Sequence, residues 1–301
     1  MEPVHVPVML KEALAALAPG LGGRFVDGTV GGGGHARALL ERVGPEGAVL
    51  GLDRDPAALG RLEETLRPGA PNLFLRRADF SRVRQVLADL GWGAVDGMLL
   101  DLGLSSFQLE GSGRGFSFAR EEPLDMRMDP ESGRPASELI NRLPEKDLAD
   151  LIFRLGEEKG SRRVARAIVR ARERRPIETS LELAGIVAGA LRRPGRPPRL
   201  HPATRTFQAL RIAVNRELES LETVLAEAPF VIRPGGRLVV ISFHSLEDRL
   251  VKQALVRGGR PAGGSGPYLR ALFKKPLRPS LEEAAANPRS RSARLRAGER
   301  V

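Results

Sequence analysis

The 301-residue sequence contains no cysteine, and this absence removes whole classes of site and chemistry. Without thiols the chain forms no disulfide, no thiolate zinc site and no iron–sulfur cluster. Reactions that begin with attack by a cysteine nucleophile, such as methylation of a pyrimidine at C5, are excluded as well. If the protein methylates a pyrimidine, it must do so at nitrogen or oxygen.

Long apolar runs and a leader-like N-terminus are also missing. No apolar run reaches the roughly 18 residues that a membrane helix needs, and residues 1–5 lack a charged segment followed by an apolar one. We therefore expect a soluble cytoplasmic protein without a membrane partner. Basic residues are in excess, with 48 Lys and Arg against 37 Asp and Glu and a formal net charge of +11. This excess favours RNA or DNA as a partner, although a basic surface also serves solubility.

The clearest pattern lies in residues 25–36, where a short apolar run ends at Asp27 and a glycine loop leads into an Ala/Leu-rich helix. A nucleotide-type ligand needs this order of strand, loop and helix, because glycines allow close approach and the helix N-terminus offers free N–H groups. Asp53 ends the next apolar run, at the distance of an acid that holds ribose hydroxyls. A plain tight turn is the alternative.

Charge distinguishes the two ligands that fit this glycine loop. Gly31, Gly33 and Ala36 match the dinucleotide fingerprint, but the pyrophosphate of a dinucleotide is repelled by a carboxylate such as Asp27. S-adenosylmethionine carries a sulfonium and an ammonium group, which carboxylates attract. Asp27 and Asp101 therefore favour the methyl donor, and a nicotinamide-dependent oxidoreductase is the alternative.

Four apolar runs, each followed by a helical pattern, predict a parallel, doubly wound α/β sheet. The expected strands are Arg24–Asp27, Ala48–Asp53, Asn72–Leu75 and Val95–Leu100. Acids follow at the carboxyl ends, where such sheets bind ligands, and these acids are Asp27, Asp53, Asp79 and Asp101. Because they are spread along the sheet edge, we expect no metal site, which would need them clustered.

Two residues after the third strand have two interpretations each. Asp79 is placed to accept a hydrogen bond from an adenine amine, and Phe80 to flank the adenine ring. Alternatively, Asp79 caps a helix and Phe80 fills the core.

Residues 105–205 interrupt the sheet pattern, and we expect them to form an all-helical insertion with an RNA-recognition role. A long loop without periodicity comes first, and such loops are uncommon unless they are functional. Four helices are expected after it, at Ala136–Asn141, Glu145–Leu155, Ser161–Arg174 and Ser180–Leu191. The insertion would separate a first part of the sheet domain, residues 1–104, from a second part, residues 206–301, with a basic tail.

One helix of this insertion carries a basic stripe. Arg162, Arg166 and Arg170 recur every four residues, beside an apolar stripe formed by Val164, Ile168 and Ala171. Further arginines follow among prolines, at Arg192, Arg193, Arg196 and Arg199. The stripe is either a nucleic-acid contact or a solvated face.

Residues 206–301 return to the sheet-forming pattern. Apolar residues spaced three and four apart from Phe207 to Leu225 predict one long helix that packs on the sheet. A turn at residues 234–236 precedes an expected strand at Arg237–Phe243, and Tyr268–Phe273 is a further candidate strand. Residues 287–296 are basic and either cross phosphates or close the sheet as an edge strand.

Several short motifs resemble one family, the bacterial 16S ribosomal RNA cytosine-N4 methyltransferases of the MraW/RsmH type. The matching segments run over nearly the whole chain and are His5–Leu10, Asp27–His35, Asp53–Pro56, Leu100–Gln108, Arg114–Phe118, Leu124–Asp129, Gly156–Glu158, His201–Gln208, Ser242–Arg249 and Asn287–Arg289. The resemblance implies a Rossmann-like class I S-adenosylmethionine-dependent methyltransferase sheet with an inserted helical domain. It also implies transfer of a methyl group to N4 of the P-site cytosine, position 1402, in 16S RNA of the 30S subunit, by a monomer or homodimer.

The resemblance also implies which residues contact the donor. They are Gly33, Gly34, His35, Asp53, Phe80, Asp101 and Gln108. Helix capping is the alternative role for His35. A DNA amino-methyltransferase and a non-catalytic assembly protein are the alternative functions.

Asp101 is the candidate catalytic residue, because its strand end faces the donor. A carboxylate there would accept the amine hydrogens of the cytosine and take up developing positive charge. If Asp101 only contacts the donor, backbone carbonyls near Gly103–Leu104 or in Ser242–His244 must serve. The target base must leave its stack, and the candidates to replace that stacking are Phe107, Phe116, Phe118 and Phe243.

Overall fold

The computed structural model describes residues 7–192, 200–256 and 266–301, and these divide into two compact units. The first unit consists of residues 1–103 and 218–301, and the second of residues 104–217. The expected boundaries were 104/105 and 205/206, so in this division the second boundary lies later, after Glu217. Within the described ranges, no helix has the length and hydrophobicity to cross a bilayer. The arginines at 193, 196 and 199, which were candidates for nucleic-acid contact, and the motif residues His5 and Val6 lie outside these ranges.

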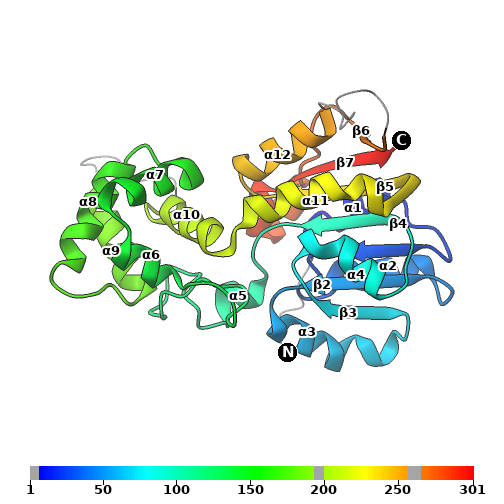
Figure 1. The fold of residues 1–301 in the computed structure, drawn as a ribbon, viewed down its shortest axis with the longest axis horizontal. Helices are drawn as coiled ribbons and strands as arrows, with labels where there is room; N and C mark the ends of the chain where they lie inside the picture. The colour runs from blue at the N-terminus through cyan, green and yellow to red at the C-terminus, as the bar shows by residue number, and fades with distance from the viewer. Residues whose placement is uncertain (1–6, 193–199, 257–265) are drawn as a thin grey trace. The chain divides into compact units, whose positions relative to one another are not determined.

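The first unit is built on a seven-stranded sheet (Figure 1). Its strands are β1 (Arg24–Asp27), β2 (Ala48–Asp53), β3 (Leu73–Arg77), β4 (Val95–Asp101), β5 (Ile232–Ser242), β6 (Leu269–Ala271) and β7 (Arg294–Arg300). The spatial order is β3-β2-β1-β4-β5-β7-β6. Strands β1 to β5 are parallel, and β7 runs antiparallel between β5 and β6. The four predicted parallel strands and the resumption of the sheet in the last third of the chain are confirmed, and the first three of these strands are followed by the helices α2 (Gly34–Val43), α3 (Pro56–Thr65) and α4 (Val83–Asp89).

Helices cover both faces of this sheet. They are α1 (Leu10–Leu17), α2 (Gly34–Val43), α3 (Pro56–Thr65), α4 (Val83–Asp89), α11 (Glu217–Val231), α12 (Ser245–Val256) and α13 (Leu281–Ala286). Apolar residues of α1, α2 and α3 form one core cluster with the sheet, and those of α4, α11 and α12 form a second. Because both faces are buried, strands β1, β2 and β4 are largely apolar, and each has an aspartate at its carboxyl end.

Two details of the C-terminal strands differ from the prediction. Strand β5 begins at Ile232, and the expected turn at residues 234–236 is a bulge within it, where pairing to β4 shifts register and Gly235 has φ of 77°. The basic segment after residue 287 does form a strand, β7, but an inner one, so the expected edge position was wrong and β6 is the edge. The pairing partner of an antiparallel strand cannot be deduced from its composition alone.

The single long helix expected from Phe207 to Leu225 is two helices. It breaks at Arg216, whose backbone is left-handed with φ of 51°, between α10 (Thr204–Asn215) and α11. Only α11 packs on the sheet, whereas Phe207 and Leu210 of α10 belong to the core of the second unit. The apolar spacing continues unchanged across the break, and an arginine gives no signal for positive φ, so the prediction was wrong for a physical reason.

Within the residues that the structure describes, the regular elements of the second unit are helices, apart from an isolated bridge between Pro123 and Thr179. Its helices are α5 (Ser106–Glu110), α6 (Ala136–Arg142), α7 (Glu145–Gly156), α8 (Ser161–Arg172), α9 (Ser180–Leu191) and α10. The four predicted helices are confirmed, and they share one core with α10. The short helix α5 was not predicted, because five residues are too few to show a periodicity.

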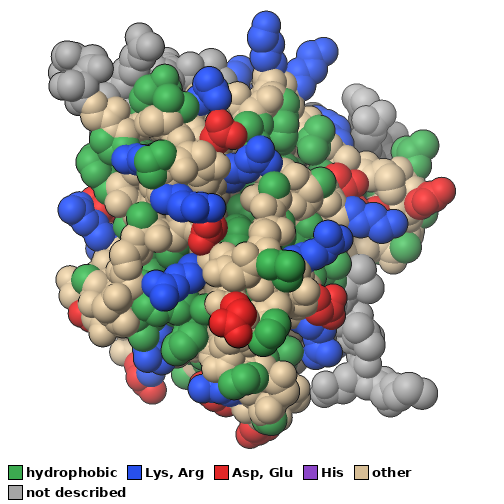
Figure 2. All heavy atoms as spheres, turned by 90° about the vertical axis from the view of Figure 1, so that its right-hand side faces the viewer, with side chains coloured by type: hydrophobic (Ala, Val, Ile, Leu, Met, Phe, Trp, Pro, Cys, Tyr) green, Lys and Arg blue, Asp and Glu red, His purple; other side chains and the backbone are tan. Residues whose placement is uncertain are grey.

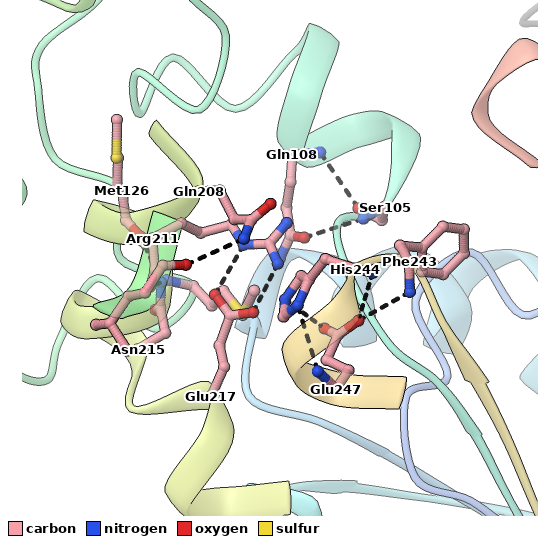
Figure 3. A network of polar contacts seen from close by, with 12 residues as sticks. Ser105, Gln108, Met126, Gln208, Arg211, Asn215, Glu217, Phe243, His244 and Glu247 are labelled. Carbon is pink, nitrogen blue, oxygen red and sulfur yellow. Dashed lines mark hydrogen bonds and ion pairs between the residues drawn. The ribbon is translucent and has the colours of Figure 1, made fainter. Parts of the chain in front are cut away.

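The motif around Met126 in this unit is held by Asn215 of α10 (Figure 3). Met126 has φ of 60°, and its carbonyl accepts a hydrogen bond of 2.7 Å from the Asn215 amide. The amide oxygen of Asn215 in turn accepts the N–H of Met128 at 2.7 Å. Both methionines are buried, so this motif of the long loop has a structural role in the unit's core.

Candidate functional site

Three aspartates end adjacent parallel strands of the first unit. Asp27 ends β1, Asp53 ends β2 and Asp101 ends β4, and β1 pairs with both of the other strands. Carboxyl ends of neighbouring parallel strands meet at one edge of a sheet, which is where doubly wound sheets bind ligands. The structure therefore brings these predicted site residues together.

The glycine loop between β1 and α2 runs along this edge. The Gly31 N–H donates to Oδ2 of Asp53 at 3.0 Å, and the Val30 N–H donates to the Leu52 carbonyl at 2.9 Å. Gly33 is the N-cap of α2, with φ of 78°, and a Cβ there would lie 2.6 Å from the Leu62 side chain. The loop is thus held against β2 and α3, and packing as well as positive φ requires glycine at position 33.

Asp53 is held by two backbone amides. Besides the Gly31 N–H, it accepts a hydrogen bond from the Asp55 N–H at 2.9 Å through Oδ1. Burial raises the pKa of its carboxyl to about 6, against the lowering effect of those amides. The amides orient the carboxylate, and each oxygen keeps a lone pair for a further donor such as a ribose hydroxyl.

Asp27 is the most buried acid of the three, with 1% of its surface exposed. Its Oδ1 accepts the Thr29 N–H at 3.2 Å, but Oδ2 has no hydrogen-bond partner among the residues that the structure describes. Burial, with a smaller contribution from the nearby charge of Asp53, raises the pKa of Asp27 to about 7. An unsatisfied buried carboxyl oxygen favours either a proton or a cation beside it.

Asp101 has the same unsatisfied character. Its backbone N–H donates to the Thr29 hydroxyl at 2.7 Å, but its side-chain Oδ1 is buried and has no hydrogen-bond partner within the described part of the chain. Burial and the charges of Asp27, Glu247 and Glu283 raise the pKa of Asp101 well above the usual range. Like charges concentrated at one sheet edge are stable only if they are protonated or neutralised.

His35 lies beside Asp101. Its Nδ1 is 3.7 Å from Oδ2 of Asp101, and its Nε2 is 3.2 Å from the Val8 carbonyl oxygen. A carbonyl only accepts hydrogen bonds, so the Nε2 carries the proton of that contact. Gly33 and not His35 is the N-cap of α2, so the alternative in which His35 caps the helix is wrong.

The remaining predicted contact residues have structural partners of their own. Asp79 caps the short helix at Phe80–Arg82 by accepting the Ser81 N–H at 2.8 Å, as in its structural interpretation. Phe80 is half-buried, and a Cβ on Gly28 would lie 3.2 Å from its Cβ, so it packs at the start of the glycine loop. Contact of these residues with adenine stays a prediction.

Gln108 belongs to the second unit. It forms a capping box with Ser105 at the start of α5: its Oε1 accepts the Ser105 N–H at 3.1 Å, and its own N–H donates to the Ser105 hydroxyl at 3.2 Å (Figure 3). The side chain is buried. Its contact with the donor stays a prediction.

A second capping box follows β5 and was not predicted. Oε2 of Glu247 accepts the N–H groups of Phe243 at 2.8 Å and His244 at 3.3 Å, and the His244 Nδ1 accepts the Glu247 N–H at 3.4 Å (Figure 3). The spacing His-x-x-Glu before a helical segment is the sequence signal, with imidazole in place of the usual hydroxyl. This box fixes the turn after β5, where the Phe243 ring packs on Gly103 after β4.

This site fits a cationic ligand of nucleotide type. Two of the carboxyls have a buried oxygen without a hydrogen-bond partner among the described residues, a third is oriented by the glycine loop, and all three end neighbouring strands. The sulfonium and ammonium groups of S-adenosylmethionine supply the positive charge that these acids lack. A parallel sheet with an antiparallel β7 between β5 and β6, together with this edge, defines a class I S-adenosylmethionine-dependent methyltransferase of Rossmann-like fold.

Comparison with known proteins identifies the family. A profile of the MraW methylase family matches residues 2–301, and the chain belongs to this family. It is 49% identical to "Ribosomal RNA small subunit methyltransferase H" of Syntrophobacter fumaroxidans, over 98% of this chain and 96% of that protein. The protein of the same name from Thermomicrobium roseum is 50% identical, over 99% and 94% respectively.

Solved structures resemble the chain at lower identity. A crystal structure of a putative rRNA-methylase from Clostridium thermocellum is 11% identical, with a TM-score of 0.46, and the comparison covers 99% of this chain and 100% of that one.

Proposed function

We propose that this protein transfers a methyl group from S-adenosylmethionine to N4 of cytosine 1402 in 16S ribosomal RNA of the small subunit. The observation that carries the proposal is the match to one methylase family over residues 2–301, with relatives named as small-subunit ribosomal RNA methyltransferases. The acidic edge of the sheet supplies the donor site that this activity needs. The test is methyl transfer to unmethylated 30S subunits, with identification of the modified nucleoside.

The amine is the difficult partner in this reaction. Its lone pair is delocalised into the cytosine ring, so it attacks only when it is held in line with the methyl group. The bound donor supplies a methyl group activated by the positive sulfonium. Positioning of such a pair contributes on the order of 7–11 kcal/mol.

Asp101 is the group that we assign to the amine. Its Oδ1, unsatisfied among the described residues, accepts a hydrogen bond from N4. It then takes the proton that leaves N4 as the new N–C bond forms and the S–C bond of the sulfonium breaks, which leaves S-adenosylhomocysteine. Burial and nearby acids raise the pKa of Asp101, and a cation at the sheet edge lowers it again, which favours the carboxylate form that accepts the proton. Positive charge on the donor thus prepares the base.

The alternative is that Asp101 only binds the donor. Asp101→Asn separates the two roles, because an amide still accepts a hydrogen bond but does not take the proton. If Asp101 is the base, the single-turnover rate at saturating donor falls about 100-fold or more. Weaker donor binding with an unchanged saturated rate would assign the amine to backbone carbonyls near Gly103 or Ser242 instead.

Of the four phenylalanines that could stack on the extruded base, two are already engaged in the second unit. Phe116 is buried in its core, and Phe118 stacks on His201 with ring centroids 4.5 Å apart. Phe107 and Phe243 are only partly buried and are the stronger candidates. Alanine at both positions should lower turnover, and unchanged turnover would rule out this role.

We assign RNA contact to the second unit on the basis of helix α8. Arg162, Arg166 and Arg170 are exposed on it, while Val164 and Ile168 are buried. Figure 2 shows a face on which Lys and Arg are spread among acidic and apolar side chains and form no single patch. A row of exposed arginines is the better footprint for phosphates. We infer a 30S partner, a monomer or homodimer, and action in the cytoplasm.

A further inference from the structure

The N-terminal strap, residues 7–9, lies against the glycine loop of the donor site. A Cβ on Gly34 would be 3.0 Å from the Pro7 ring, so the strap touches the first residue of α2. Val8 and Met9 are buried, with 5% and 0% of their surfaces exposed. The strap therefore packs against the start of α2, next to the glycine loop, although it is remote in sequence from Asp101.

Glu283 of α13 holds this strap in place. Its Oε1 accepts the Met9 N–H at 2.7 Å, across 274 residues of sequence. Met9 is the N-cap of α1, has φ of 51° and makes no side-chain cap of its own. A carboxylate at a helix N-terminus is also favoured by the helix dipole. Glu283 itself is oriented by Ser280, whose hydroxyl accepts the Glu283 N–H at 3.0 Å.

The strap in turn orients His35. The Val8 carbonyl, one residue before Met9, is 3.2 Å from Nε2 of His35 and therefore binds its N–H. This contact turns Nδ1 towards Asp101, 3.7 Å away. A continuous path of contacts thus runs from Glu283 through Met9 and Val8 to the imidazole beside Asp101.

We propose that Glu283 is a positioning residue of the methyl-donor site, which acts through the N-terminal strap to orient His35 towards Asp101. The proposal rests on the donor site and is independent of the RNA substrate. The charged and titratable groups that act on Asp101 are Asp27, Glu247, Glu283 and His35, so Glu283 also contributes negative charge to the site. The competing explanation is that Glu283 merely fastens the two ends of the chain.

Three variants separate these explanations. Glu283→Ala removes the acceptor and the charge, Glu283→Gln keeps an acceptor oxygen and removes only the charge, and Glu282→Ala is the matched control because Glu282 is exposed on the same helix. The measurements are calorimetric affinities for S-adenosylmethionine and S-adenosylhomocysteine between pH 5 and 9, and amide exchange of the strap in the free protein.

We expect Glu283→Ala to weaken donor binding about tenfold, as the loss of one oriented polar contact does, and to speed exchange in the strap. Glu283→Gln should keep the affinity for the donor within about twofold of that of the unmodified protein. Amide exchange in the strap should stay as slow as in the unmodified protein, because the acceptor for the Met9 N–H is kept. It should also move the pH midpoint of donor binding to lower pH, because removal of a negative charge lowers the pKa of Asp101.

The proposal would be overturned if the Glu283 variants had the same donor affinity and pH midpoint as Glu282→Ala and differed only in a lower melting temperature. Glu283 would then only hold the two ends of the chain together. If Glu283→Ala does not fold, Glu283→Asp takes its place, because it keeps the charge but is too short to reach Met9. It should weaken donor binding without moving the pH midpoint, and unchanged affinity would overturn the proposal. None of these results depends on RNA methylation.

Discussion

His35 Nδ1 and Asp101 Oδ2 face each other at 3.7 Å beside the glycine loop. Since the Nε2 proton of His35 is donated to the Val8 carbonyl, Nδ1 presents either a lone pair or a second proton to the carboxyl group. Repulsion between a lone pair and a carboxylate is relieved when one proton lies between them. A cation beside these groups favours the carboxylate form of Asp101, so we expect donor binding to be linked to proton release.

The first prediction concerns this proton release. Burial raises the pKa of Asp27 to about 7, so at pH 7 its carboxyl is partly protonated before the donor binds, and burial with nearby acids shifts the pKa of Asp101 in the same direction. The sulfonium of S-adenosylmethionine should lower both pKa values and expel protons, whereas S-adenosylhomocysteine, without the sulfonium, should expel fewer. Calorimetry in two buffers of different ionisation enthalpy counts the protons. Equal release by both ligands would contradict the assignment.

The second prediction concerns stability and pH. The pKa of Asp27 is higher in the folded protein than in the unfolded chain, so its contribution is complete below the unfolded value of 3.8 and is lost as pH rises through about 7. Asp27→Asn should remove this loss, and its stability relative to the unmodified protein should rise by several kcal/mol, on the order of 4, between pH 4 and 8.

Urea unfolding at several pH values measures this difference. The control is Asp89→Asn, because Asp89 is exposed on α4 in the same unit. The prediction would be contradicted if the difference in free energy of unfolding between Asp27→Asn and the unmodified protein stayed constant from pH 4 to 8. Asp27 would then already be ionised in the folded protein over this range.

The third prediction separates two neighbouring acids. Asp53→Ala should weaken binding of S-adenosylhomocysteine roughly 10- to 100-fold, because it removes a carboxylate that is placed for ribose hydroxyls and that anchors the Gly31 amide. Asp55→Ala should instead cost about 0.5–2 kcal/mol of stability with little change in affinity, because Asp55 caps α3 through the Ala57 N–H. Calorimetry measures the affinity of each variant, and thermal unfolding measures its stability. Similar effects of the two variants on affinity would argue against a ribose contact.

The fourth prediction concerns the basic stripe of α8. Replacing Arg162, Arg166 and Arg170 by Gln should weaken RNA binding and lower the slope of log affinity against log salt by up to about 3, roughly one unit per phosphate contact. The control replaces Arg134, Arg142 and Arg175, which are exposed in the same unit but lie outside α8. They form ion pairs with Glu138 or Glu182, as Arg166 of the stripe does with Glu145 at 3.7 Å. Filter binding over a salt series measures the slope. Equal slopes for the two triple variants would show that the stripe on α8 does not contact RNA phosphates.

Sequence alone was sufficient for the sheet and its acidic edge. Strands β1, β2 and β4 are mostly buried and each ends in an aspartate, so the positions of Asp27, Asp53 and Asp101 follow from the strand ends and the rule that carboxyl ends share an edge. The glycine loop was recognised by its composition, although the reason for glycine at Gly33 is partly the packing of Leu62, which no local pattern reveals.

The features that sequence missed depend on contacts between distant segments. The Met9–Glu283 hydrogen bond joins residues at opposite ends of the chain. Neither residue has a local signal for it. The helix break at Arg216 requires a left-handed backbone conformation, which an arginine in the sequence does not indicate. The capping box at His244 uses an imidazole where a hydroxyl is usual. In these places tertiary contacts decide the structure, while the local sequence pattern gives no sign of the change.

Transfer of labelled methyl from S-adenosylmethionine tests the central claim most directly. The substrates are unmethylated 30S subunits, naked 16S RNA and duplex DNA, each digested afterwards to nucleosides. We predict label in N4-methylcytidine from the 30S subunits, and none from subunits whose cytosine 1402 is replaced by uridine. Label in DNA, in another nucleoside or at another position, or no label from an enzyme that binds the donor, would contradict the proposed function.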